Sequence, residues 1–165
     1  EQSAPDAAAP TKSAMEPDEY AAKWGTEVSE LTIERIEKVL EGDGLPHGSN
    51  EFIAVTQLED VRFQIHREPA DAPWAQIETR IAVPGEGHTE VSLQEKANQW
   101  NNAHLQPTVF PIEDGDGWAL MAASRFFVGE GLSDRQIHAM LRRGLIIGLS
   151  AAQEVPALFA QGSEE

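Results

Sequence analysis

Two stretches of the sequence alternate apolar and polar residues with a period of two, and this alternation constrains the fold more than any other feature. The first covers residues 61–66 and the second covers residues 77–83. Successive side chains of a β-strand point to opposite faces of a sheet, so each stretch is predicted to be a strand with one buried face. We therefore expect a sheet that packs against helices.

The segments around these strands indicate an antiparallel meander. A further strand is predicted over residues 52–56. The short polar segment Leu58-Glu59-Asp60 is suited to turn that strand directly into the strand that begins at Val61. Residues 69–73 contain two prolines and make a longer connection to the third strand.

A hairpin is predicted further along the chain. Strands over residues 108–112 and 118–128 flank Glu113-Asp114-Gly115-Asp116-Gly117, whose Asp-Gly pairs supply the positive φ angles that tight hairpins need. The same segment resembles the start of a calcium loop. However, Trp118 and Arg125 stand where an EF-hand needs an oxygen ligand and a glutamate. The hairpin is the favoured interpretation.

The first of three predicted helices begins at Ser29 or Thr32 and ends at Glu41, before Gly42-Asp43-Gly44. Its apolar face consists of Ile33, Ile36, Val39 and Leu40. Gly42-Asp43-Gly44 lacks the Gly-Lys-Ser/Thr end of a phosphate-binding loop, so a helix cap is the simpler interpretation.

The second predicted helix begins at a capping box formed by Ser92 and Glu95. Three residues share its apolar face: Leu93, Ala97 and Trp100. We expect the Trp100 ring to fill the space against the sheet. Asn98 and Asn101 are expected to satisfy backbone groups near the end of the helix.

The last predicted helix begins at a capping box of Ser133 and Gln136 and is closed by Pro156. Its apolar residues recur every fourth position: Ile137, Leu141, Leu145 and Leu149. Gly144 and Gly148 lie four apart and allow close approach of another backbone. That backbone can belong to the chain's own sheet or to a second subunit, and we favour the chain's own sheet.

These elements define an α+β fold in the order α-β-β-β-α-β-β-α, with an antiparallel sheet of about five strands. The folded domain is expected over residues 28–157, followed by a C-terminal tail over residues 158–165. Residues 1–27 are expected to form a flexible acidic tail, because residues 1–16 are rich in Ala, Pro, Ser and Asp. A short helix is predicted over residues 17–24, where Tyr20 and Trp24 share one face.

The charge of the chain limits its partners. Twelve basic and 28 acidic residues give a net charge of −16, which disfavours binding to nucleic acid or to anionic membranes. No stretch approaches the roughly 20 apolar residues that span a bilayer. The absence of cysteine fits a reducing compartment, so we expect a cytoplasmic protein, although a removed export signal is compatible with the first residues.

No motif indicates a catalytic, cofactor or metal site. The five histidines are scattered, and no two have the spacing of paired zinc ligands on one helix face. Gly148-Leu149-Ser150 matches half of a nucleophile elbow, but Ser150 belongs to a helix and the second glycine is missing. We expect a non-enzymatic module that binds protein. The alternative is a small-molecule-binding domain or a hydrolase whose site is assembled from scattered residues, for example around His66 and His104.

The order of elements, together with Asn98-Gln99-Trp100-Asn101, Gly42-Asp43-Gly44-Leu45 and Gly131-Leu132-Ser133, resembles the YbjN-domain family over roughly residues 31–155. That bacterial family is described as regulators of sensory transduction and is similar in fold to type III secretion chaperones, which commonly dimerise. The resemblance therefore implies a chaperone-like or regulatory module that can form a homodimer. It implies no catalytic residues.

The last helix carries the main basic stripe of this acidic chain, formed by Arg135, His138, Arg142 and the adjacent Arg143. A solvated helix face is the simplest interpretation. Our sharper hypothesis is that the stripe receives an acidic partner, either another protein or the chain's own residues 16–27, with Tyr20 and Trp24 as anchors.

Overall fold

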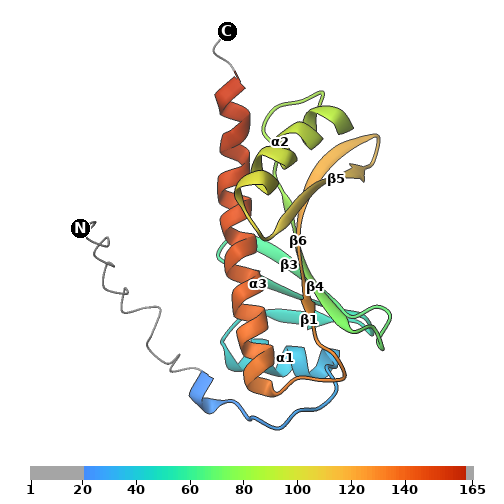
Figure 1. The fold of residues 1–165 in the computed structure, drawn as a ribbon, viewed down its shortest axis with the longest axis vertical. Helices are drawn as coiled ribbons and strands as arrows, with labels where there is room; N and C mark the ends of the chain where they lie inside the picture. The colour runs from blue at the N-terminus through green and yellow to red at the C-terminus, as the bar shows by residue number, and fades with distance from the viewer. Residues whose placement is uncertain (1–20, 163–165) are drawn as a thin grey trace, which may run out of the picture.

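The computed structural model describes residues 21–162 as a six-stranded antiparallel sheet with helices on one face (Figure 1). The strand order is β1-β2-β3-β4-β6-β5. The strands are β1 (His47–Ser49), β2 (Ile53–Leu58), β3 (Val61–His66), β4 (Trp74–Ile81), β5 (Thr108–Asp114) and β6 (Gly117–Phe127). The helices are η2 (Ala21–Lys23), α1 (Ile33–Gly42), α2 (Glu90–Ala103), α3 (Asp134–Glu154) and η3 (Val155–Gly162).

The predicted α+β fold and its order of elements are confirmed, with small differences. The sheet has a sixth strand, β1, which pairs with β2. Strand β4 begins three residues before Ile77 and ends at Ile81. The hairpin predicted around Gly115 is present, because Asp114 faces Gly117 across a two-residue turn in which Gly115 has a φ of 58°.

The capping box at the start of α2 lies three residues earlier than predicted. The helix begins at Glu90, and Thr89 is its N-cap. The Thr89 side chain accepts a hydrogen bond from the Ser92 backbone, and the Ser92 hydroxyl accepts one from the Thr89 backbone. Ser92 is therefore the third residue of the helix and not its N-cap. Its hydroxyl takes the position that the glutamate or glutamine side chain has in the usual capping box.

Helix α1 begins directly after Thr32, one of the two predicted starts, and ends at Gly42, one residue later than predicted. Thr32 is its N-cap, and its side chain accepts a hydrogen bond from the Arg35 backbone. At the other end Leu45 N–H donates to the Leu40 carbonyl and Gly44 N–H donates to the Glu41 carbonyl, which is a Schellman motif. Gly44 has the positive φ of 75° that this motif requires. The motif places Asp43 at the C-cap, where it faces α3.

Helix α3 packs on the centre of the sheet through its two glycines. A Cβ at Gly148 would lie 2.6 Å from the Phe63 ring, and one at Gly144 would collide with Ile77. The glycines therefore accommodate the chain's own sheet, as favoured above. Pro156 does not end the helical path, because η3 continues through it. Its ring is tolerated because it lies in the first turn of η3.

A second core lies between α2, β5, β6 and the end of α3. Trp100 is only 3% exposed there, so its predicted burial is confirmed. Leu158 and Phe159 of η3 pack against the same core, so the first part of the expected C-terminal tail contacts the domain. Residues 1–20 of the expected N-terminal tail lie outside the described part of the chain.

The end of α2 bonds to the backbone of β5. The Trp100 indole N–H donates to the Pro107 carbonyl over 3.0 Å. The Asn101 side chain donates to the Val109 carbonyl over 2.8 Å and accepts from the Val109 N–H over 2.9 Å. Asn101 thus satisfies strand groups and not helix groups. Asn98 is exposed and accepts a hydrogen bond from the Gln94 side chain, so the role predicted for it was wrong.

The longer connection between β3 and β4 is held by a buried arginine. Arg67 is 4% exposed, and its guanidinium donates to four backbone carbonyls, those of Leu31, Ala70, Ala72 and Trp74. Burial lowers the pKa of Arg67, while Glu30 and Asp71 act in the opposite direction. The arginine therefore closes this loop onto the segment that precedes α1.

Candidate binding surfaces

The face of the sheet opposite the helices is not covered by any described element (Figure 1). We call it the open face. A hollow of about 660 Å³ lies on it, lined in part by Val55, Arg62, Gln64, Glu78, Arg80 and Met121. Beyond the hollow, Trp74 and Phe127 lie opposite each other on β4 and β6. They are 41% and 81% exposed, so this face presents large apolar side chains to solvent.

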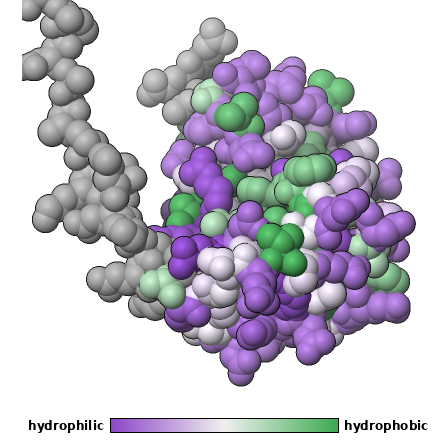
Figure 2. All heavy atoms as spheres, turned by 60° about the horizontal axis from the view of Figure 1, so that its bottom comes forward, coloured by the Kyte–Doolittle hydropathy of each residue, from purple (hydrophilic) through white to green (hydrophobic). Residues whose placement is uncertain are grey.

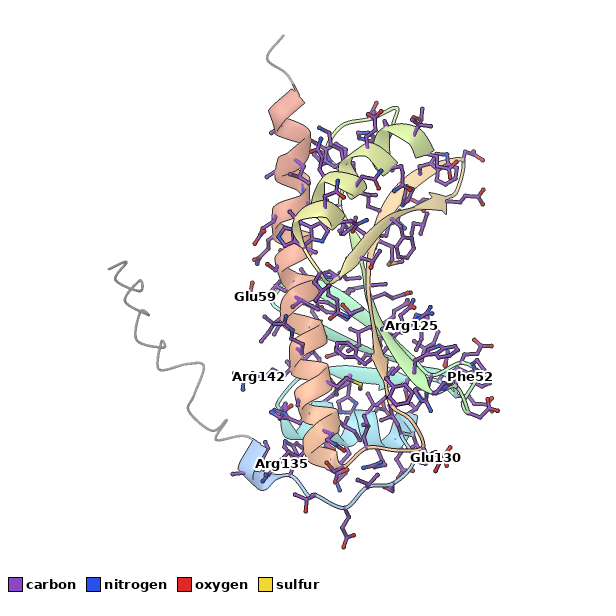
Figure 3. The ribbon with its side chains drawn as sticks, viewed as in Figure 1. Phe52, Glu59, Arg125, Glu130, Arg135 and Arg142 are labelled. Carbon is purple, nitrogen blue, oxygen red and sulfur yellow. The ribbon has the colours of Figure 1, made fainter. Side chains whose placement is uncertain are left out.

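The open face also carries arginines. Arg125 donates to the Gln76 side chain over 2.9 Å, and its guanidinium lies 5.4 Å from the centre of the Trp74 ring. Arg80 forms an ion pair with Asp114, and Arg62 lines the hollow. Figure 3 shows Arg125 on the side of the sheet away from Arg135 and Arg142. The surface thus combines aromatic and cationic groups, the side chains that most often dominate protein interfaces.

A second surface is an apolar groove between α1 and α3, which we call the α1–α3 groove. It has a volume of about 240 Å³. Its lining is aliphatic, with a charged rim: Leu40, Asp43, Leu45, Leu58, His138, Leu141, Arg142, Leu145 and Ile146. Figure 2, turned so that the α1 end comes forward, shows hydrophobic patches among hydrophilic side chains. Apolar grooves with a few polar groups are typical sites for peptide side chains.

Trp24 lies against residues at the rim of the α1–α3 groove. Its ring stacks on that of His138, with 6.2 Å between centroids. His138 Nδ1 is 2.6 Å from Asp43 Oδ2, and Lys23 Nζ lies 3.7 Å from the other oxygen of the same carboxylate. Trp24 requires the missing side chain of Gly42, because a Cβ there would collide with the indole ring. The residues before α1 are thus fitted to the domain.

The segment that joins Trp24 to α1 is also fixed to α3. Ser29 and Leu132 exchange backbone hydrogen bonds, and Gly131 leaves room for the Ser29 backbone. Arg35 donates to the carbonyls of Ser29 and Leu132 and to the Asp134 carboxylate over 2.9 Å. The hydrogen bond from Arg35 holds the pKa of Asp134 below its usual value, although partial burial opposes this. Charge and backbone contacts together join the two helix starts.

The residues of the predicted basic stripe of α3 do not all lie on its exposed side. Arg135 and Arg142 extend from the same side of the helix (Figure 3), and Arg143 is exposed next to them. His138 is 4% exposed and turned towards Asp43, because it lies three residues before the core residue Leu141. Trp24 meets the stripe at His138. Tyr20 lies outside the described residues.

The histidines named for a scattered catalytic site do not come together. His66 Nε2 is 2.8 Å from Glu78 on the open face, whereas His104 stacks on Trp100 at 3.6 Å between centroids. Between residues 21 and 162 no group of His, Asp and Glu side chains is arranged to hold a metal ion. Within the same range, none of the helices combines the length and apolar character needed to cross a membrane.

Comparison with known proteins agrees with the fold. The family model YbjN, described as "Putative bacterial sensory transduction regulator", matches residues 32–155. The crystal structure of YbjN from E. coli, titled "a putative transcription regulator", superposes with a TM-score of 0.63 and 12% sequence identity. The superposition covers 82% of this chain and 96% of that one. None of the curated proteins matches the sequence.

Proposed function

Because this chain belongs to the YbjN family, a family described as sensory transduction regulators, we propose that it is a non-enzymatic regulatory module that binds a protein through its open face. The observation that carries this proposal is the exposure of Trp74 and Phe127 beside Arg125 on a sheet face that no helix between residues 21 and 162 covers. Burying such side chains against a partner removes apolar area from water and stabilises the complex.

The partner that fits the open face has an acidic segment with apolar side chains. Arg62, Arg80 and Arg125 stand on a face of a chain whose net charge is −16. A carboxylate-bearing segment is repelled by the acidic chain as a whole but attracted to the arginines of the open face. This difference orients the partner as it approaches. Nucleic acid and anionic membranes carry a continuous negative charge and are disfavoured by the net charge of the chain. The cysteine-free composition leads us to place this activity in the cytoplasm.

A chaperone-like role is part of the same proposal, since an extended acidic client can lie across the open face. The alternative occupant of that face is a second copy of the chain. The two occupants make different predictions, because a homodimer changes the mass of the pure protein and a client does not. Light scattering on the purified chain separates them before any partner is known.

Affinity capture from the native cell tests the proposal with matched variants. One variant carries Arg62→Glu and Arg125→Glu, and a second carries Trp74→Ser. The control carries Arg143→Glu, at an exposed position of α3. We expect one protein to be recovered with the wild type and the control but lost with both open-face variants. The purified partner should then bind at least tenfold more weakly to the Arg62→Glu, Arg125→Glu variant, and its affinity for the wild type should fall at high salt, which screens the attraction to the arginines.

Two outcomes would count against the open face as the protein-binding site. Retention of the partner by both open-face variants would move the site elsewhere. Recovery of a small molecule and no protein would favour the ligand-binding alternative. Each variant should first show the wild-type melting temperature within about 2 °C, since surface substitutions usually change stability by under about 0.5 kcal/mol.

A further inference from the structure

The α1–α3 groove is lined mainly by residues of the two helices and shares no lining residue with the hollow on the open face, so an inference about it is independent of the function proposed above. We propose that the groove is an internal docking site for residues 16–20 of this chain. In this arrangement Tyr20 inserts beyond Trp24, and the carboxylates of the segment face Arg142. The segment is then an intramolecular cover of the groove.

The apolar part of the argument begins at Trp24. The preceding described residues, Ala21–Lys23, form η2, so the chain arrives at the domain beside the rim of the groove. Trp24 stacks on His138, which itself lines the groove. Tyr20 is four residues before Trp24 and directly precedes η2. The four residue steps from Tyr20 to Trp24 span at most about 14 Å, so the chain supplies a second aromatic ring close to the one already docked.

The groove has the chemistry to accept that ring. Leu141, Leu145 and Ile146 form its α3 wall, and Ile146 is 49% exposed. A tyrosine ring buries its apolar body against aliphatic side chains while its hydroxyl stays at the rim. Burial of the ring and of Ile146 removes apolar surface from water, which is the main source of favourable free energy in such contacts.

The charges of the segment match those beside the groove. Residues 16–20 read Glu-Pro-Asp-Glu-Tyr, with three carboxylates next to the aromatic ring. Arg142 lines the groove, and Arg135 extends from the same side of α3 (Figure 3). Attraction between opposite charges at a partly exposed surface is weakened by salt. Because the segment is tethered to η2, its effective concentration is on the order of millimolar, and individually weak contacts are sufficient.

Paramagnetic NMR on the full chain tests this docking. The chain has no cysteine, so Ser13→Cys provides one attachment point for a nitroxide label just before the segment. We expect the label to broaden the methyl signals of Leu145 and Ile146 at least twofold more than those of Ile53 and Val55 on β2. The difference should shrink at 1 M NaCl, where the Debye length is about 3 Å.

Two further variants identify the anchor. In the labelled chain, Tyr20→Ala should abolish the selective broadening of the groove methyls. Met15→Ala, which removes an apolar side chain just outside the segment, should leave it unchanged. Equal broadening of both sets of methyls, or selective broadening that survives Tyr20→Ala, would overturn the proposal.

A mixing experiment separates this chain from a second copy as the source of the segment. Isotope-labelled protein without nitroxide is mixed with nitroxide-labelled protein at natural isotope abundance. An intramolecular cover leaves the groove methyls sharp in the mixture. Broadening in the mixture would show that the segment of another copy occupies the groove, and the intramolecular proposal would be wrong.

Discussion

The ring of Phe63 on β3 occupies the space that a side chain at Gly148 of α3 would need. A Cβ at that position would lie 2.6 Å from Phe63 Cε1, which is closer than real Cβ atoms approach. This contact sets the distance between α3 and the centre of the sheet. It therefore also sets the position of the α3 side chains that line the α1–α3 groove.

Gly148→Leu should therefore destabilise the protein even though leucine is the better helix former. Overpacking costs about 1–3 kcal/mol, and the gain in helix propensity is about 1 kcal/mol, so we expect a net loss of up to about 2 kcal/mol. Urea denaturation measures it. The control is Ala139→Leu at an exposed position of α3, which should stay within about 0.5 kcal/mol of the wild type. Equal midpoints for the two variants would contradict the packing described for α3.

Trp100 contributes both bulk and a hydrogen bond, and two substitutions separate these. Trp100→Ala should cost about 3–5 kcal/mol through the cavity it leaves. Trp100→Phe keeps most of the volume but removes the donor to the Pro107 carbonyl, which should cost about 1–3 kcal/mol. Thermal unfolding followed by circular dichroism measures both. Val91→Ala, at an exposed position of the same helix, is the control. A melting temperature unchanged by Trp100→Ala would make the ring a surface group.

The ion pair between Arg35 and Asp134 should make stability depend on pH. Because the pKa of Asp134 is lower in the folded than in the unfolded chain, its contribution is fully present above the unfolded pKa of about 3.9. The contribution is lost as pH falls through the lower, folded pKa. Asp134→Asn should thus cost about 1–2 kcal/mol at pH 7 and less below pH 4.

Urea denaturation of the wild type and the Asp134→Asn variant across pH 2–8 measures this difference. Asp116→Asn in the exposed hairpin turn serves as the control and should give a small difference at every pH. A cost of Asp134→Asn that does not change between pH 7 and pH 3 would show that the carboxylate charge is not what stabilises the contact.

Arg67 should be irreplaceable by lysine. Its planar guanidinium reaches four carbonyls, whereas a lysine ammonium has three donors at a single point and cannot span them. Arg67→Lys should cost about 2–4 kcal/mol, since buried carbonyls are left unpaired. Hydrogen exchange should also show lost protection at the Ala72 amide. Arg62→Lys, at an exposed position of the preceding strand β3, is the control for stability. Wild-type stability of Arg67→Lys would mean that water replaces the lost bonds.

Much of the fold follows from residue pattern because local periodicity records which side of an element is buried. The alternation around Phe63 and Ile65 and the four-residue repeat from Ile137 are examples, since each is set by contact with a single apolar layer. Strand β1 has no such pattern. It has three residues, His47–Ser49, and pairs on one side only, so its position depends on β2 rather than on its own sequence.

The binding surfaces were harder to predict because they depend on contacts that are distant in sequence. His138 was grouped with Arg135 and Arg142, although its spacing from Leu141 also places it on the apolar face, and Asp43 decides between the two. Trp74 and Phe127 are brought together by the pairing of β4 with β6. No local pattern in either strand indicates that register, so the open face could not be recognised from the sequence.

The hydrogen bonds from α2 to β5 have a consequence for how this protein can assemble. Pro107, Val109 and Pro111 alternate along the margin of the sheet that faces away from β6, and the first two are already bonded to Trp100 and Asn101. Pro111 has no N–H to offer, and the opposite margin, β1, is three residues long. Neither margin presents a continuous template for an added strand. The two edges of the described sheet therefore disfavour strand-to-strand pairing between copies of the chain.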